Sequence, residues 1–231
     1  MNSRTLLISI LPSVIIALWV YYHDRYEREP FYLLIKTFIL GALTIIPALF
    51  IERFLVGLNI FPGLLGDAYV AFVVAGFIEE YFKRWVVLRT IYHNKEFNEK
   101  LDGIAYSVYS ALGFATVENI MYIANNIAME PLVGFYRGIF SVPAHTMFGI
   151  TMGYYLSLAK FSKDGVERRK FLSKSLWIPV ILHGIFNYIL LSKLDILMIL
   201  FIPFVLYLWI INIKKIRLCT RESQWNSNGE K

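Results

Sequence analysis

Seven long apolar segments, separated by short polar loops, determine what this chain can fold into. Most of them approach the ~20 residues that an α-helix needs to cross a bilayer. Inside lipid the backbone has to satisfy its own hydrogen bonds, so such segments form helices. The sequence therefore predicts an all-α, polytopic bundle of about seven transmembrane helices, at residues 5–22, 31–51, 64–82 (or on to 92), 103–127, 133–159, 176–191 and 195–213.

The composition is that of a membrane protein and not of a soluble domain. Of the 231 residues, 57% are hydrophobic and 17% are charged, and the mean hydropathy is +0.55, whereas soluble domains carry about 25% charged residues. The single cysteine, Cys219, excludes an internal disulfide. We expect one membrane domain over residues 1–219 and a polar, disordered cytoplasmic tail over residues 220–231.

The positions of lysine and arginine predict the orientation. Most of these 23 residues lie in the tail and in the loops after the first, third and fifth segments, which places these parts in the cytoplasm and the N-terminus outside. Because the basic residues lie in short loops and form no stripe, the net charge of +6 indicates orientation, and we expect no nucleic-acid partner.

Ionisable side chains within the apolar segments are the candidate functional residues. A charge at the bilayer centre costs about 2.5–3.5 kcal/mol, so such groups usually face one another around a polar site. Small residues accompany two of them on one helix face, which predicts close helix packing there: Ser107 and Ala111 precede Glu118, and Gly149 and Gly153 follow His145. We expect one water-accessible cavity formed by Glu79, Glu80, His145 and His183, with Glu118 and Asn187 at its edge.

Simpler interpretations of the same residues exist. On a helix, Glu79 pairs with Lys83 and Glu80 with Arg84 at i,i+4, as at an interfacial helix end. A membrane glutamate or histidine also often serves packing alone. A non-enzymatic alternative is a proton-coupled transporter or channel that uses the Glu/His cluster as a relay.

Two hydrolytic mechanisms fit these residue types. In the first, Glu79 or Glu80 works with His145 to remove a proton from water, while His183 and Asn187, one turn apart, donate hydrogen bonds to the oxyanion. In the second, His145, His183 and a glutamate such as Glu118 bind zinc. The amide of Asn187 is a poor zinc ligand, so we favour the version without a metal cofactor, with Glu79 as the base.

Three short motifs resemble those of a known family. Residues 79–84 (EEYFKR) are similar to E-E-x-x-x-R with the arginine one position early, and residues 183–187 (HGIFN) match H-x-x-x-N. His145 matches F-x-x-x-H only in its histidine. With Asp102-Gly103, residues 113–119 (GFATVEN) and Arg137, the chain resembles the PrsW family of bacterial membrane proteases, and more distantly the CAAX prenyl protease and bacteriocin-processing superfamily.

The resemblance implies a multi-pass protease of the bacterial cell membrane. Its substrate would be a single-pass, membrane-anchored anti-sigma factor, and its first (site-1) cut would start the release of an extracytoplasmic-function sigma factor during envelope or antimicrobial-peptide stress. By analogy with the prenyl proteases, the resemblance also implies a metal-independent glutamate mechanism, with catalytic Glu79, Glu80, His145, His183 and Asn187 supported by Glu118, Lys83 and Arg84; PrsW-type proteins are also classed with metallopeptidases. One conflict follows: such a cut belongs outside, yet the predicted orientation places Glu79 toward the cytoplasmic half of its segment.

Overall fold

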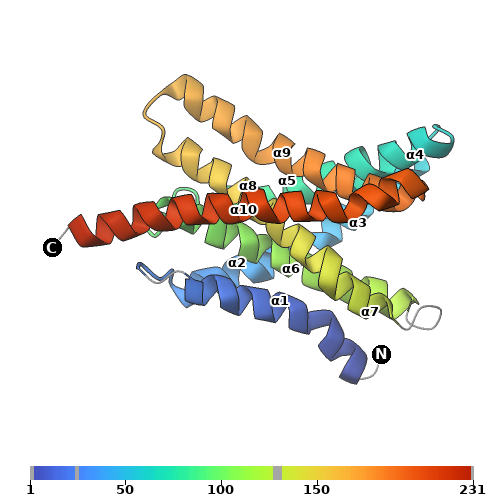
Figure 1. Cartoon of the computed structure of the whole chain (residues 1–231), viewed down its shortest axis with the longest axis horizontal. Coiled ribbons are helices and arrows are strands. Elements are labelled where there is room, and N and C mark those ends of the chain that lie inside the picture. Colours follow the sequence, from blue (N-terminus) through green and yellow to red (C-terminus); the bar gives the residue numbers. More distant parts are fainter. Residues whose placement is uncertain (1–2, 24–25, 127–131, 230–231) are drawn as a thin grey trace.

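The computed structural model describes residues 3–23, 26–126 and 132–229 and forms an all-α bundle in this part of the chain (Figure 1). The predicted fold class is confirmed. Four helical stretches among the described residues are long and apolar enough to cross a membrane: 6–23, 31–57, 165–192 and 195–225. The predicted number of about seven membrane spans stays a prediction.

The second predicted segment is divided into two helices that follow α1 (Ser3–His23). Helix α2 (Phe31–Leu43) ends at Thr44, and α3 (Ile45–Gly57) continues beyond it. Pro47 accounts for the break, because proline lacks an N–H and its ring clashes with the carbonyl four residues earlier. The hydroxyl of Thr44 donates to the Gly41 carbonyl at 2.6 Å.

The third segment is one long rod with an irregular centre. It comprises α4 (Gly63–Tyr69), the π-helical segment η1 (Val70–Phe77) and α5 (Ile78–Thr90), so the longer of the two predicted extents is confirmed. Glu79 and Glu80 lie in the first turn of α5, directly after η1. Because π-helical turns are rare and occur often at functional sites, the presence of η1 indicates that this region is functional. Glu79 lies near the middle of the rod.

Helix α6 (Lys100–Asn126) is the centre of the bundle and packs against α2 and α8 (Val142–Phe161). Glycine makes the α6–α8 approach possible, because an ideal Cβ on Gly153 would lie only 2.6 Å from the Ile104 Cα. The small residues predicted to face a neighbour do so: a Cβ on Gly149 would lie 3.1 Å from the Ala111 Cβ.

The last two-fifths of the chain comprises α7, a second π-helical segment, η2, and three long helices. The short α7 (Val133–Tyr136) and η2 (Arg137–Ser141) lead into α8, which has Pro143 in its first turn. Helix α9 (Gly165–Ser192) packs on α8 and η1, and α10 (Asp195–Gly229) closes the bundle. The prediction of a disordered tail is wrong for residues 220–229, because α10 continues through them.

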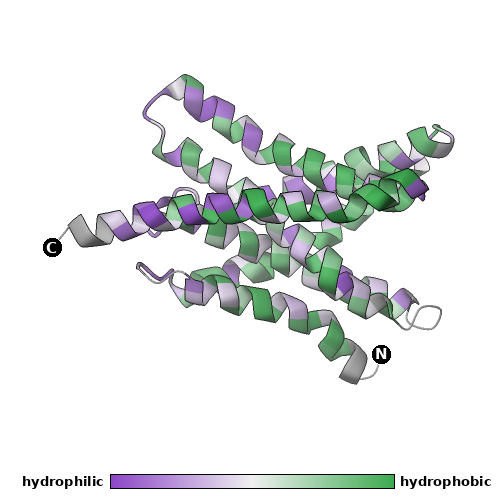
Figure 2. Ribbon diagram, in the orientation of Figure 1, coloured by the Kyte–Doolittle hydropathy of each residue, from purple (hydrophilic) through white to green (hydrophobic). Residues whose placement is uncertain are grey.

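The loops predicted to be cytoplasmic lie together at one end of the bundle. Asn98 donates to Glu27 at 2.6 Å and so joins the α5–α6 loop to the α1–α2 loop, while Lys100 pairs with Glu222 of α10 at 2.8 Å. Lys160, at the end of α8, donates to the Tyr92 carbonyl. Figure 2 shows the polar residues of α9 and α10 gathered toward this end, and Figure 1 shows α4 and α7 at the other.

Candidate active site

Glu79, Glu80 and Lys83 form a buried charged cluster on one face of α5. The Lys83 Nζ lies 3.0 Å from Glu79 Oε2 and 2.8 Å from Glu80 Oε1, and the side chains of Lys83 and Glu80 are wholly buried. The predicted Glu79–Lys83 pair is present, but the predicted Glu80–Arg84 pair is wrong. Arg84 donates instead to Ser175 Oγ at 2.8 Å, in the N-terminal half of α9 (Gly165–Ser192).

His145 lies between this cluster and Glu118. Its Nε2 is 3.0 Å from Glu118 Oε2 on α6, and its Nδ1 is 3.0 Å from Lys83 Nζ. A carboxylate can only accept and an ammonium can only donate. In the neutral ring, Nε2 therefore carries the proton and Nδ1 presents its lone pair toward the cluster.

His183 repeats this arrangement from the opposite side. Its Nδ1 is 2.9 Å from Glu80 Oε1, while its Nε2 lies 4.0 Å from Glu79 Oε2. The ring is stacked on Phe148, with centroids 4.9 Å apart, which fixes its plane. A neutral His183 thus presents the Nε2 lone pair inward, so the oxyanion role predicted for it requires the doubly protonated ring.

Arg137 completes the polar set on the far side of Glu118. Its NH2 group lies 2.9 Å from Glu118 Oε1, and its Nε donates to Asn119 Oδ1 at 2.8 Å. The guanidinium also lies over the Tyr122 ring. Glu118 is therefore a bridge between His145 and Arg137.

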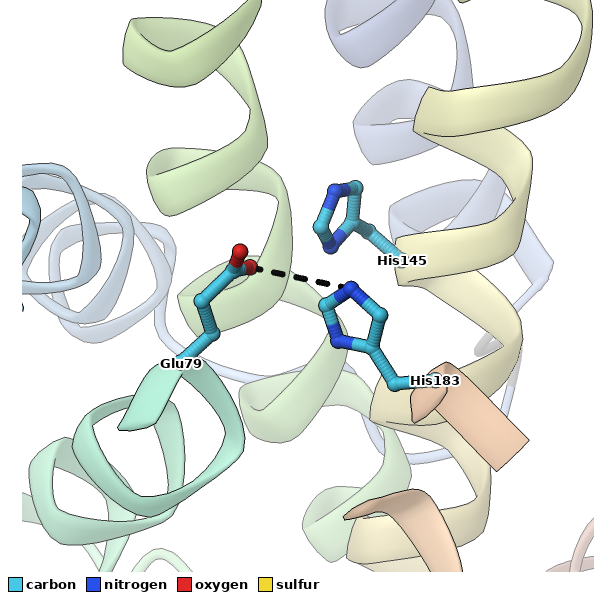
Figure 3. A group of neighbouring side chains, drawn as sticks. All are labelled: Glu79, His145 and His183. Atoms are coloured by element: carbon cyan, nitrogen blue, oxygen red, sulfur yellow. Dashed lines mark ion pairs between the residues drawn. The ribbon is translucent and has the colours of Figure 1, made fainter. Parts of the chain in front are cut away.

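Glu79, His145 and His183 point toward a common centre (Figure 3), and within the described residues they form the group of donors spaced closely enough to hold a metal ion, with ligand atoms within 4.8 Å of one another. The alternative zinc set with Glu118 needs correction, because Glu118 contacts the outer nitrogen of His145. The donors fit zinc by type. The second ring nitrogen of each histidine also fits a zinc site: His145 Nε2 faces Glu118 and His183 Nδ1 faces Glu80, and metal-ligating histidines usually donate this other N–H to a carboxylate. Lys83, however, contacts two of the three ligand atoms.

A cavity of about 470 Å³ opens beside the histidines. Asn187 lines it, as do His145 and His183, and its remaining wall is mostly aromatic and aliphatic. The lining comes from the ends of α6, α9 and α10 that lie away from the basic loops, and from α7, η2 and α8. The residues are Glu118, Tyr122, Tyr136, Arg137, Phe140, Ser141, Ala144, His145, Phe148, His183, Phe186, Asn187, Leu190, Met198 and Phe201.

Glu52 is an acidic residue of this region that the sequence analysis missed. It lies on α3, and with Glu79 and Glu118 it lines a second cavity of about 210 Å³. The predicted segment ended at residue 51, which placed Glu52 in a loop. The available signal was the apolar run after Arg53, which extends α3 to Gly57.

The protein-family model described as PrsW family intramembrane metalloprotease matches residues 29–211. The chain is 44% identical to Protease PrsW of Clostridioides difficile (strain 630), over 91% of this chain and 89% of the relative. It is 34% identical to Protease PrsW of Bacillus subtilis (strain 168), over 89% and 91%. No solved structure matches the chain.

Proposed function

Because the chain belongs to the PrsW family of intramembrane proteases, we propose that it makes the first cut in a single-pass, membrane-anchored anti-sigma factor. The protein is a membrane peptidase and a multi-pass protein of a bacterial membrane. Its proposed role is to begin the release of an extracytoplasmic-function sigma factor during envelope or antimicrobial-peptide stress.

One observation carries this proposal: a buried carboxylate and two histidines converge beside a cavity at one end of the bundle. Glu79, His145 and His183 are all at least nine-tenths buried, and the cavity is lined from the end opposite the basic loops. The positive-inside rule makes that end the outer one. A cut near the outer surface fits a first cleavage and eases the conflict between orientation and function.

In the proposed reaction, the chain's own side chains activate a water molecule. Glu79 accepts a proton from the water, with His145 beside it, as the water oxygen bonds to the peptide carbonyl carbon. The carbon–nitrogen bond then breaks, and the proton passes to the leaving amine. Glu79 suits this role better than Glu80, because Glu79 lines a cavity whereas Glu80 is wholly buried against Lys83 and His183.

Stabilisation of the oxyanion falls to His183 and Asn187. Asn187 lines the cavity and can donate from its amide. His183 can donate from Nε2 only as an imidazolium, and that form would lie between Glu80 at 2.9 Å and Glu79 at 4.0 Å. Donors placed before the reaction are effective because the charge develops in a water-poor site.

Glu79, His145 and His183 are the residues that would hold a zinc ion. Such an ion would polarise the peptide carbonyl and acidify a bound water. We propose the metal-independent version, because the Lys83 ammonium already contacts Glu79 and His145.

The test compares membrane proteins of cells with the wild-type protein and with Glu79→Gln, His145→Ala or His183→Ala. We expect each variant to remain in the membrane and to lose cleavage of the anti-sigma factor by about 10²–10⁴-fold, the usual contribution of general acid–base catalysis. Glu167→Gln, at an exposed position in the first turn of α9, is the matched control and should cleave normally. Normal processing by all three variants contradicts the site, and proton flux without proteolysis favours the transporter alternative.

A further inference from the structure

The second cavity borders the candidate site at Glu79 and Glu118, and neither His145 nor His183 lines it. Its wall includes Glu52 on α3, Glu79 on α5, and Glu118 and Asn125 on α6. One carboxylate oxygen of Glu52, Oε1, is buried and has no hydrogen-bond partner within the described part of the chain. The mechanism proposed above gives Glu52 no role.

The two cavities meet the site at different residues. Glu79 lines only the second cavity, whereas His145 and His183 line only the first. Glu118 and Tyr122 line both and lie at the boundary between them. A peptide in the first cavity would therefore approach the histidines and leave the other side of Glu79 open.

The second cavity also runs from the interior to the surface. Glu79 is buried at 6% exposure, while Tyr122 is 45% exposed and Asn125, in the last turn of α6, is exposed as well. This surface lies at the outer end of α3 and α6, opposite the basic loops. The cavity thus connects the buried carboxylate to the outer face of the bundle.

The size and the lining of the cavity suit water. A site needs about 10–15 Å³ of accessible volume to hold one water molecule, together with two to four polar partners. The cavity provides about 210 Å³, and beside the apolar side chains of its wall (Ile45, Leu49, Phe114 and Met121) it offers polar groups from Glu52, Glu79, Glu118, Tyr122 and Asn125. An apolar cavity of the same size would stay dry.

We propose that this cavity is the entry path for the hydrolytic water and that Glu52 is the positioning residue that keeps it hydrated. The inference rests on the proposed function. Water enters past Asn125, is held by the Glu52 carboxylate and passes Glu79 toward the peptide carbonyl, without crossing the space that the peptide itself occupies. The water oxygen then bonds to the carbonyl carbon as Glu79 takes the water proton, the carbon–nitrogen bond breaks, and Glu79 passes the proton to the leaving nitrogen.

The first test measures the hydration of the second cavity and does not depend on cleavage activity. A cysteine is introduced as Met121→Cys, at a position that lines the cavity, and exposed to a small, membrane-impermeant thiol reagent from outside. We expect it to react, and to react several-fold more slowly when combined with Glu52→Leu but not with Glu52→Gln. Phe50→Cys, on an exposed apolar position of α3, should stay unreactive as the lipid-facing control. An unreactive Met121→Cys, or a rate unaffected by Glu52→Leu, overturns the proposal.

The second test separates kcat from KM. Glu52→Leu should lower kcat by about tenfold or more with little change in KM, since misplacement of a reactant acts on the chemical step. Glu52→Gln keeps a polar group and should retain most of the activity. Arg53→Leu makes the same kind of change at the neighbouring exposed residue and should leave kcat unchanged. Equal loss in the Gln and Leu variants, or a change in KM alone, overturns the positioning role. Hydration without any proteolysis contradicts only the proposed function.

Discussion

Lys83 lies at the centre of the charged cluster, where its Nζ is within 3.0 Å of Glu79, Glu80 and His145. Two carboxylates on adjacent residues of a buried helix face need such a partner, because removal of one member of a buried ion pair costs about 3–5 kcal/mol. The same ammonium opposes a metal ion. A divalent ion about 4 Å from it would meet a repulsion of about 8 kcal/mol at an effective dielectric constant of about 20.

Purified protein in detergent, stripped with a strong chelator, should keep its cleavage activity, because Lys83 supplies the positive charge beside Glu79 and His145. Activity and metal content are measured on the same sample. Loss of activity that stoichiometric zinc restores would reject this view and make Glu79, His145 and His183 ligands. Lys83→Met removes the competing ammonium and should raise zinc affinity relative to the wild type.

The sequence predicted which polar residues come together, but not how they pair. An unpaired ionisable group is costly in lipid, so convergence of Glu79, His145 and His183 followed from that cost alone. Pairing depends on side-chain directions that spacing does not resolve. Glu80 and Arg84 are correctly spaced for an ion pair, yet Arg84 donates to Ser175 and the Leu172 carbonyl on α9.

Among the elements, the packing of α6 against α8 fixes the position of Glu118 relative to His145. Glu118 on α6 and His145 on α8 are joined across 3.0 Å, and glycines set how closely the two helices approach. An ideal Cβ on Gly153 would lie 2.6 Å from the backbone Cα of Ile104. Backbone atoms inside a packed helix pair have little room to give way.

Gly153→Ala should therefore separate α6 from α8 and weaken the Glu118–His145 contact. We expect a loss of about 1–3 kcal/mol in the free energy of unfolding, typical of overpacking, together with a fall in cleavage. Thermal unfolding in detergent and the cleavage assay measure the two effects. Gly165→Ala, at the start of α9 where a Cβ would meet nothing within 4 Å, is the control. A stable, fully active Gly153→Ala variant would show that the helix spacing does not set the site.

Local sequence predicted the helices better than it predicted their irregularities. Small residues at i,i+4 spacing indicated the faces of α6 and α8 that meet. Pro47 is the residue type that interrupts a helix, and α2 ends close to it. The π-helical segment before Glu79 had no comparable signal, because residues 70–77 (VAFVVAGF) are uniformly apolar and give no periodic cue. The polar residues 220–229 are helical because α10 extends past the bundle core, where Lys100 contacts Glu222.

The whole molecule has two chemically different ends, and this difference decides which way the site faces. Hydrophilic residues of α9 and of the C-terminal part of α10 gather at one end (Figure 2), where contacts such as Asn98–Glu27 and Lys100–Glu222 join the loops that carry most of the lysine and arginine. Both cavities are lined mainly from the other end. If lysine and arginine stay in the cytoplasm, the substrate and the water reach Glu79 from outside.

Single cysteines at exposed loop positions test this orientation. A membrane-impermeant thiol reagent applied to intact cells should label Ile60→Cys and Lys193→Cys, at the cavity end, and should label Lys95→Cys and Lys163→Cys only after the membrane is opened. The native thiol adds little background, because Cys219 is buried inside the bundle and a buried structural cysteine is inert. The reverse pattern would place the candidate site on the cytoplasmic side, where it meets a different segment of any single-pass substrate. The proposed first cut would then be excluded even if Glu79 and the histidines prove catalytic.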